Sequence, residues 1–110
     1  MEGLGIRVVP ASEFFELASS LDRPLIIDVR APEEVKAHPA PLPALHINLE
    51  DSNFNLMVHS LDKRRPVIVI CQDGRRAPKA CRYLALADFG EVWCLQGGLN
   101  ALETQNTDQP

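Results

Sequence analysis

The feature that most constrains the fold is an unbroken run of β-branched residues, Val67-Ile68-Val69-Ile70, which ends at Cys71. Four such residues in succession predict a strand that is buried on both faces, as in a parallel sheet covered by helices. The chain continues through Gln72-Asp73-Gly74-Arg75-Arg76 to Pro78, and proline is favoured in the first turn of a helix. Cys71 is therefore expected at the carboxyl end of a buried strand, on a short loop that leads into a helix.

Strands and helices alternate along the rest of the chain. Short apolar runs indicate strands, and apolar residues at helical spacing indicate helices. Besides the strand before Cys71, we expect strands at 6–9, 25–30, 44–49 and 91–95. We expect helices at 11–20, 31–37, 50–62 and 77–88. An extended Pro-rich loop is expected at 38–43, and a tight turn into a short last helix at 96–102. This order predicts a three-layer α/β domain with a largely parallel sheet.

The bulk properties of the chain narrow the class of protein. Its 110 residues predict one domain over 1–103, and the segment 104–110, which has no apolar residue, is predicted to be a frayed tail. No apolar run approaches the roughly 20 residues of a membrane span, and no leader is recognisable, so we expect a cytoplasmic protein without membrane contact. A net charge of −4 argues against a broad nucleic-acid surface.

The remaining cysteines and the histidines give no sign of a metal site or a disulfide framework. The chain has three cysteines, an odd number, with no Cys-x-x-Cys pair and no metal-ligand spacing among His38, His46 and His59. We therefore expect no metal site, and we interpret His46 as a rim or core histidine rather than a catalytic base. Cys81 and Cys94 are interpreted as core residues, with a resolving thiol as the alternative for Cys81.

The surroundings of Cys71 predict a reactive thiol. A helix N-terminus and adjacent cations stabilise the thiolate, which is the nucleophilic form of cysteine. The loop amides are predicted to surround the sulfur and to hold an anion attached to it, while the two arginines add positive charge for an anionic donor. An inert buried cysteine is the alternative, which the polar neighbours of Cys71 disfavour. The expected substrate-binding loop consists of Gln72, Asp73, Gly74, Arg75 and Arg76.

Two further polar residues, Asp28 and Arg30, are expected at the same edge of the sheet. They lie at the end of the predicted strand 25–30, and in open α/β sheets ligands bind at the carboxyl ends of the strands. The favoured interpretation is structural, with Asp28 and Arg30 paired with each other or with loop backbone. The alternative is that they form the floor of a pocket around Cys71.

Three segments together resemble the signatures of rhodanese domains. The segment 25–35 contains Asp-Val-Arg followed by Pro and Glu, as in the first signature. The segment 67–77 resembles the second, Cys-x-x-Gly-x-Arg-Ser/Thr, with Ala77 in the hydroxyl position. The segment 95–102 resembles the terminal Leu-x-Gly-Gly-x-x-x-Trp, with Leu102 in place of Trp. Because the segments follow in the right order, the chain is similar to single-domain rhodaneses.

This resemblance implies a parallel five-stranded sheet of order 1-5-4-2-3 and a sulfurtransferase activity. Cys71 would take a sulfane sulfur from a donor such as thiosulfate, hold it as a persulfide against the amides of 72–76, and pass it to cyanide, a thiol or another protein, with no cofactor. Asp28 and Arg30 would support the pocket. Phosphatases and arsenate reductases of similar fold use a Cys-x5-Arg loop, whereas Cys71 to Arg76 is Cys-x4-Arg, which favours sulfur over phosphate. A non-catalytic binding module is the remaining alternative.

Overall fold

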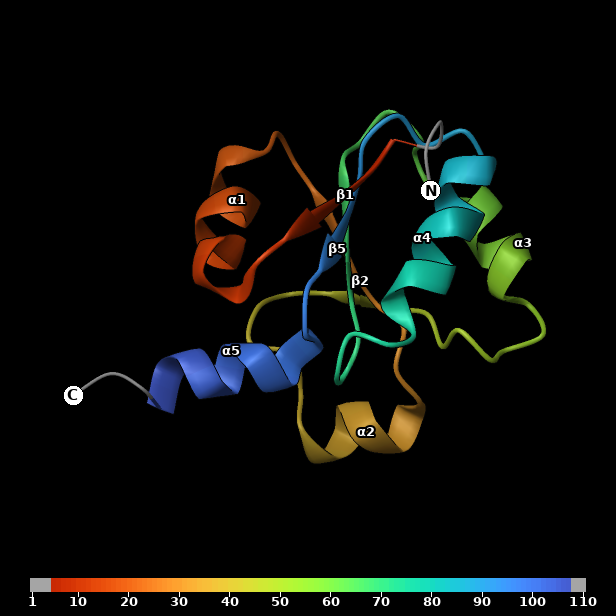
Figure 1. Ribbon diagram of the computed structural model, residues 1–110. Coiled ribbons are helices and arrows are strands. Elements are labelled where there is room, and N and C mark those ends of the chain that lie inside the picture. Colours follow the sequence, from red (N-terminus) through yellow and green to blue (C-terminus); the bar gives the residue numbers. More distant parts are fainter. Residues whose placement is uncertain (1–4, 108–110) are drawn as a thin grey trace.

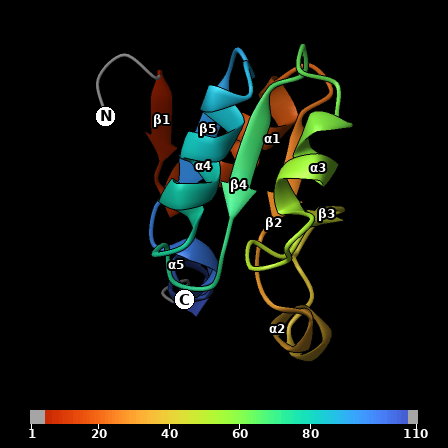
Figure 2. The same ribbon diagram turned by 90° about the vertical axis from the view of Figure 1, so that its right-hand side faces the viewer.

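The computed structural model describes residues 5–107, with side chains through Thr104. These residues form a parallel sheet with helices on both faces (Figures 1 and 2), as predicted. The strand order is β1-β5-β4-β2-β3, which confirms the order implied by the resemblance. The elements are β1 (Ile6–Val9), a 3-10 turn η1 (Ala11–Glu13), α1 (Phe14–Ser20), β2 (Leu25–Asp28), α2 (Pro32–Ala37), β3 (Leu45–His46), α3 (Phe54–His59), β4 (Val67–Ile70), α4 (Ala77–Leu86), β5 (Val92–Leu95) and α5 (Gly98–Thr107).

The β4 strand is buried on both faces, and its side chains alternate between two apolar clusters. Val67 and Val69 belong to the cluster that includes residues of α3 and α4. Ile68 and Ile70 belong to the cluster that includes residues of α1 and α5. Since successive side chains of a strand point to opposite faces, Cys71 continues the first series and packs on the α4 side.

All strands run in the same direction, so their carboxyl ends meet at one edge of the sheet. This is the lower edge in Figures 1 and 2, where α2, the start of α5 and the loop from β4 to α4 come together. The fold therefore brings the first, second and third signature segments to the same place.

Several elements are shorter than the sequence predicts. The strand expected at 25–30 ends at Asp28, the strand at 44–49 is reduced to Leu45–His46, and the helix at 50–62 to Phe54–His59. In the segment before α3, the amides of Glu50 and Asn53 donate to the side-chain oxygens of Asn48 and Asp51. Such local bonds compete with helical hydrogen bonds, which explains the late start of α3.

The last helix is longer than predicted. Residues 104–107 of the segment that the sequence predicts as a frayed tail form the last turn of α5. Leu99 and Leu102 bury the start of the helix in the core, and each residue added to a formed helix gains a backbone hydrogen bond. The rest of the predicted tail, 108–110, lies outside the described residues.

Two features are absent from residues 5–107. No helix in this range is long and apolar enough to cross a lipid bilayer. The same residues contain no cluster of His, Cys, Asp and Glu side chains that is suited to hold a metal ion.

Candidate functional site

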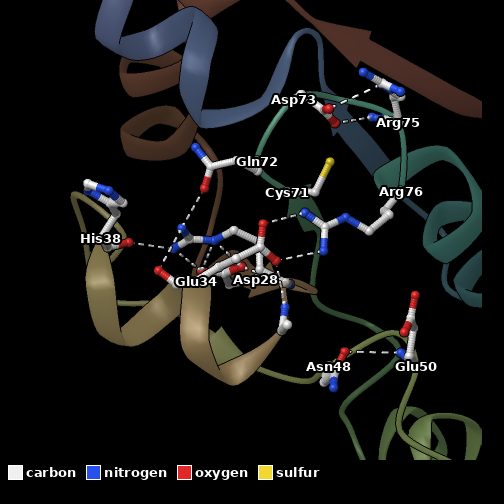
Figure 3. A network of polar contacts seen from close by, with 12 residues as sticks. Asp28, Glu34, His38, Asn48, Glu50, Cys71, Gln72, Asp73, Arg75 and Arg76 are labelled. Atoms are coloured by element: carbon white, nitrogen blue, oxygen red, sulfur yellow. Dashed lines mark hydrogen bonds and ion pairs between the residues drawn. The ribbon is translucent and has the colours of Figure 1, made fainter.

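Cys71 is the first residue after β4, and its side chain is fully buried. Its Sγ accepts hydrogen bonds from the backbone N–H of Gly74 at 3.2 Å and of Ala77 at 3.3 Å. Figure 3 shows the loop curving around this sulfur, with Gln72 and Asp73 on one arm and Arg76 on the other. Two N–H dipoles that converge on one point form a cradle that can hold an anionic group attached to the sulfur.

The set of amides around the sulfur differs from the predicted one. The sequence predicts that the amides of 72–76 surround Sγ. Of these, the Gly74 amide donates to Sγ, whereas the Arg75 amide donates to Asp73 Oδ1 at 3.2 Å. The second donor, Ala77, lies beyond the predicted loop and is the first residue of α4. Its N–H is one of the unpaired donors that every helix has at its start.

The Cys71 loop packs closely against the turn that begins α5. Gly74 has φ +87°, and a Cβ on it would lie 2.8 Å from the backbone nitrogen of Gly97. A Cβ on Gly98 would lie 2.6 Å from the carbonyl oxygen of Cys71. The amide of Leu99 donates to that same carbonyl at 2.9 Å. The glycines therefore allow two backbones to approach, and α5 fixes the strand end that carries the sulfur.

A buried ion pair lies next to the loop. The Arg30 guanidinium is fully buried, and its Nη2 contacts Asp28 Oδ2 at 2.8 Å. It also donates to the carbonyl oxygen of His38 at 2.8 Å and to Gln72 Oε1 at 2.9 Å. Asp28 and Arg30 are thus paired with each other, the arrangement that the sequence favoured, and Arg30 links β2, the Pro-rich loop and the residue after Cys71. A buried guanidinium needs this many acceptors because it carries five N–H donors and a positive charge away from water.

The Gln72 side chain joins this ion pair to α5. Its Nε2 donates to Asn100 Oδ1 at 2.7 Å, while its Oε1 accepts from Arg30. The backbone carbonyl of Gln72 also accepts the Asn100 amide at 2.9 Å. Gln72 therefore faces α2 and α5, whereas Cys71 faces α4.

Both loop arginines are paired with carboxylates. Arg76 binds Glu34 of α2 through two hydrogen bonds of 2.7 and 2.8 Å (Figure 3), and Glu34 also accepts the amide of Ala31. The Arg76 hydrogen bonds lower the pKa of Glu34 to about 2, although partial burial opposes the shift. Arg75 contacts Asp73 at 3.1 Å and its side chain is 86% exposed. The sequence predicts that these arginines add positive charge for an anionic donor, and no local pattern indicates the pairing of Arg76 with Glu34.

A cavity of about 300 Å³ lies beside Gln72, at the same edge of the sheet. No local sequence pattern indicates this cavity, because its walls come from four separate segments. One signal was available: Phe14 and Phe15 are adjacent in α1 and cannot both face the core, and Phe15 is 46% exposed. The cavity is lined mainly by Phe15, Pro39, Pro41, Gln72, Leu99 and Leu102.

The other two cysteines lie in the core, as predicted. Cys81 Sγ points to the carbonyl oxygen of Trp93 at 3.6 Å. Its hydrogen bond with Cys94 and its burial raise the pKa of Cys81. His46 Nε2 lies 2.7 Å from the carbonyl oxygen of Arg30, so this imidazole donates a hydrogen bond at the rim of the sheet.

Comparison with known proteins agrees with the fold. The model of the Rhodanese-like domain matches residues 14–105. The chain belongs to this family. It is 31% identical over 77 residues to a sulfurtransferase of Allochromatium vinosum, covering 70% of this chain and 69% of that protein. It is 32% identical over 59 residues to the thiosulfate sulfurtransferase GlpE of Shewanella oneidensis, covering 54% of this chain and 58% of that protein.

A solved structure supports the same assignment at the level of the fold. The rhodanese-related protein of Thermoplasma volcanium superposes with a TM-score of 0.77 at 20% sequence identity, over 94% of this chain and 95% of that one. The family match over 14–105 includes β2, β3, β4 and β5 and the helices from α1 to most of α5.

Proposed function

We propose that this rhodanese-like domain is a sulfurtransferase in which Cys71 carries the sulfur as a persulfide. The observation that carries the proposal is the pair of amide donors, from Gly74 and Ala77, directed at Cys71 Sγ. Such donors stabilise a thiolate before the reaction and an anionic persulfide after it. The sulfurtransferases among its relatives support the same reaction class.

The reaction has two steps that return the thiolate. In the first, the Cys71 thiolate attacks the sulfane sulfur of a donor such as thiosulfate, and the donor's S–S bond breaks. Sulfite leaves with the bonding electron pair, and Cys71 becomes a persulfide with one negative charge. In the second step, an acceptor such as cyanide, a thiol or a protein thiol attacks the outer sulfur, and Cys71 leaves as thiolate. Covalent storage of the sulfur predicts ping-pong kinetics.

The chain itself supplies what these steps need. The Gly74 and Ala77 amides hold the anionic sulfur, and the close packing of the loop on Gly97 and Gly98 fixes their positions. Because Cys71 is fully buried, part of the loop 72–76 must move before a donor touches Sγ. The Arg76–Glu34 pair ties this loop to α2 and must break if Arg76 moves with it. No step requires a metal or an organic cofactor.

The test is a thiosulfate:cyanide assay on the purified chain, with thiocyanate as the measured product. We expect thiocyanate to form with ping-pong kinetics and to be absent with Cys71→Ala. Phosphate release from an aryl phosphate, without sulfur uptake, would instead assign the site to phosphatase chemistry. A protein partner that binds both the native chain and Cys71→Ala, with no thiocyanate formed, would indicate a binding module.

A further inference from the structure

A groove of about 270 Å³ lies between the η1–α1 segment and the strands β1 and β5. We call it the Trp93 groove, and it is lined by Val9, Glu13, Glu16, Leu17, Ser20 and Trp93. Its apolar residues belong to or pack against the cluster on the α1 side of the sheet. Cys71 packs on the α4 side, and Figure 1 shows α1 and α4 on opposite sides of the sheet. The Trp93 groove is therefore separate from the Cys71 loop.

The rim of the groove carries two carboxylates, those of Glu13 and Glu16. Both side chains are exposed, and both line the same groove. Within residues 5–104, whose side chains are described, neither carboxylate has an ion pair or a hydrogen bond. By contrast, Glu34 beside the Cys71 loop holds Arg76. Two such carboxylates next to an apolar wall attract a cation that carries an apolar stem.

Trp93 supplies an aromatic face that is held in place. Its Nε1 donates to Glu91 Oε2 at 2.8 Å, which fixes the indole ring at the wall of the groove. The guanidinium of Arg7 lies 5.4 Å from the ring centroid, and its Nη1 contacts the same Glu91 oxygen at 3.9 Å. The indole thus already binds one guanidinium by a cation–π contact. Because Glu91 offsets the charge of Arg7, the charges of Glu13 and Glu16 remain to attract a second cation.

We propose that the Trp93 groove is a docking site for a basic segment of another protein and takes one arginine side chain of that segment. The methylene stem lies on Val9 and Leu17, and the guanidinium lies between the indole of Trp93 and the two carboxylates. Arginine fits better than lysine, because a planar guanidinium stacks on an indole and binds a carboxylate through two hydrogen bonds. The groove is smaller than the roughly 300–1,000 Å³ of small-molecule sites, so one protein side chain fits it better than a whole organic ligand.

The first test uses the fluorescence of Trp93, which is the only tryptophan of the chain and reports on the groove directly. The probe is an acetylated and amidated alanine pentapeptide with arginine at its centre. Its control is the same peptide with citrulline, which has nearly the shape of arginine but no charge. We expect a saturable change in fluorescence with the arginine peptide and a Kd about tenfold higher for the citrulline peptide. Equal Kd values, or no saturable change with the arginine peptide, would overturn the proposal.

Paired substitutions test the two carboxylates. Glu13→Gln combined with Glu16→Gln keeps the size of both side chains and removes both charges, so the Kd of the arginine peptide is expected to rise by about tenfold. The matched control combines Glu33→Gln and Glu50→Gln, which remove the same charge from exposed glutamates outside the groove. We expect the control to change the Kd by less than about twofold, because distant surface charges are screened by salt. Equal Kd values in the two double variants would contradict the role of the carboxylates.

Two further measurements separate a protein segment from a free cation, and docking from sulfur transfer. Ethylguanidinium is expected to bind about fivefold more weakly than the peptide, because it lacks part of the stem that covers the apolar wall. Equal binding would assign the groove to a free cation and overturn the assignment to a protein segment. The inference goes beyond the proposed function, so Cys71→Ala is expected to bind the peptide with an unchanged Kd, and the Glu13→Gln and Glu16→Gln double variant to form thiocyanate at the native rate. A raised Kd in Cys71→Ala would overturn the separation of the groove from the Cys71 loop.

Discussion

Cys71 and Cys81 are both fully buried, and both belong to the apolar cluster on the α4 side of the sheet. They differ in their hydrogen-bond partners, because donors face one sulfur and an acceptor faces the other. Cys71 Sγ accepts hydrogen bonds from two backbone amides. Cys81 Sγ donates to the carbonyl oxygen of Trp93, and the neighbouring Cys94 thiol together with burial raises the pKa of Cys81. The two buried sulfurs therefore differ in the dipoles that face them, and converging N–H groups are the arrangement that can hold an anionic group.

The difference arises from position along a single helix. Cys71 precedes α4, whose first residue, Ala77, has an amide that is not used within the helix. Cys81 lies in the middle of α4, where the backbone amides are already paired and a side chain meets only the sheet behind it. We therefore expect changes at the Cys71 loop to affect sulfur transfer, and changes at Cys81 to affect stability.

The largest effect is expected from Gly74→Ala. The new Cβ would lie 2.8 Å from the Gly97 nitrogen at a φ of +87°, so the loop must shift and Sγ loses an amide donor. Loss of one donor of this type lowers activity by about 100-fold or more. The measurement is kcat/KM for thiocyanate formation. Gly90→Ala is the control, because a Cβ there meets nothing within 4 Å. If Gly74→Ala retained activity within about threefold of the native chain, the role of this amide would be wrong.

An intermediate effect is expected from the pair that ties the Cys71 loop to α2. Arg76 lowers the pKa of Glu34 from 4.5 to about 2, so the pair stabilises the fold above about pH 4.5 and this contribution is lost as the pH falls toward 2. Glu34→Gln should reduce the free energy of unfolding by about 1 kcal/mol at about pH 6, because the pair is partly exposed. The difference should shrink in urea titrations at about pH 3. A difference that stays constant with pH would contradict the ion pair.

The smallest effect on catalysis is expected from Cys81→Ala. The substitution removes a buried sulfur and leaves a small void, so it should lower the free energy of unfolding by about 1 kcal/mol. Its thiocyanate activity should equal that of the native chain, because no donor to Cys71 Sγ is changed. A fall of about tenfold in activity, with the stability unchanged, would make Cys81 part of the reaction and remove the contrast with Cys71.

The sequence predicted the parts of this site that depend on neighbours in the chain. The β-branched run, Gly74 and Pro78 are local signals, and they were sufficient to place Cys71 between a buried strand and a helix start. The alternation of strands and helices indicated the layers, and the resemblance supplied the strand order. The length of α5 was missed because polar composition does not end a helix that is already anchored.

The remaining features depend on residues that are distant in the sequence. Glu34 and Arg76 are 42 positions apart, as are Arg30 and Gln72, so no local pattern shows that they bond. For this reason the sequence does not show that Arg76 is paired with a carboxylate of α2. The cavity likewise exists only after α1, the Pro-rich loop and α5 meet at the strand ends.

The central claim is that Cys71, and not the equally buried Cys81, carries the sulfur. Intact-mass spectrometry after incubation with a sulfur donor tests it most directly. We predict a gain of one sulfur atom that dithiothreitol removes, that Cys71→Ser abolishes and that Cys81→Ala retains. A chain that gains no sulfur, or a gain that persists in Cys71→Ser, would contradict the claim.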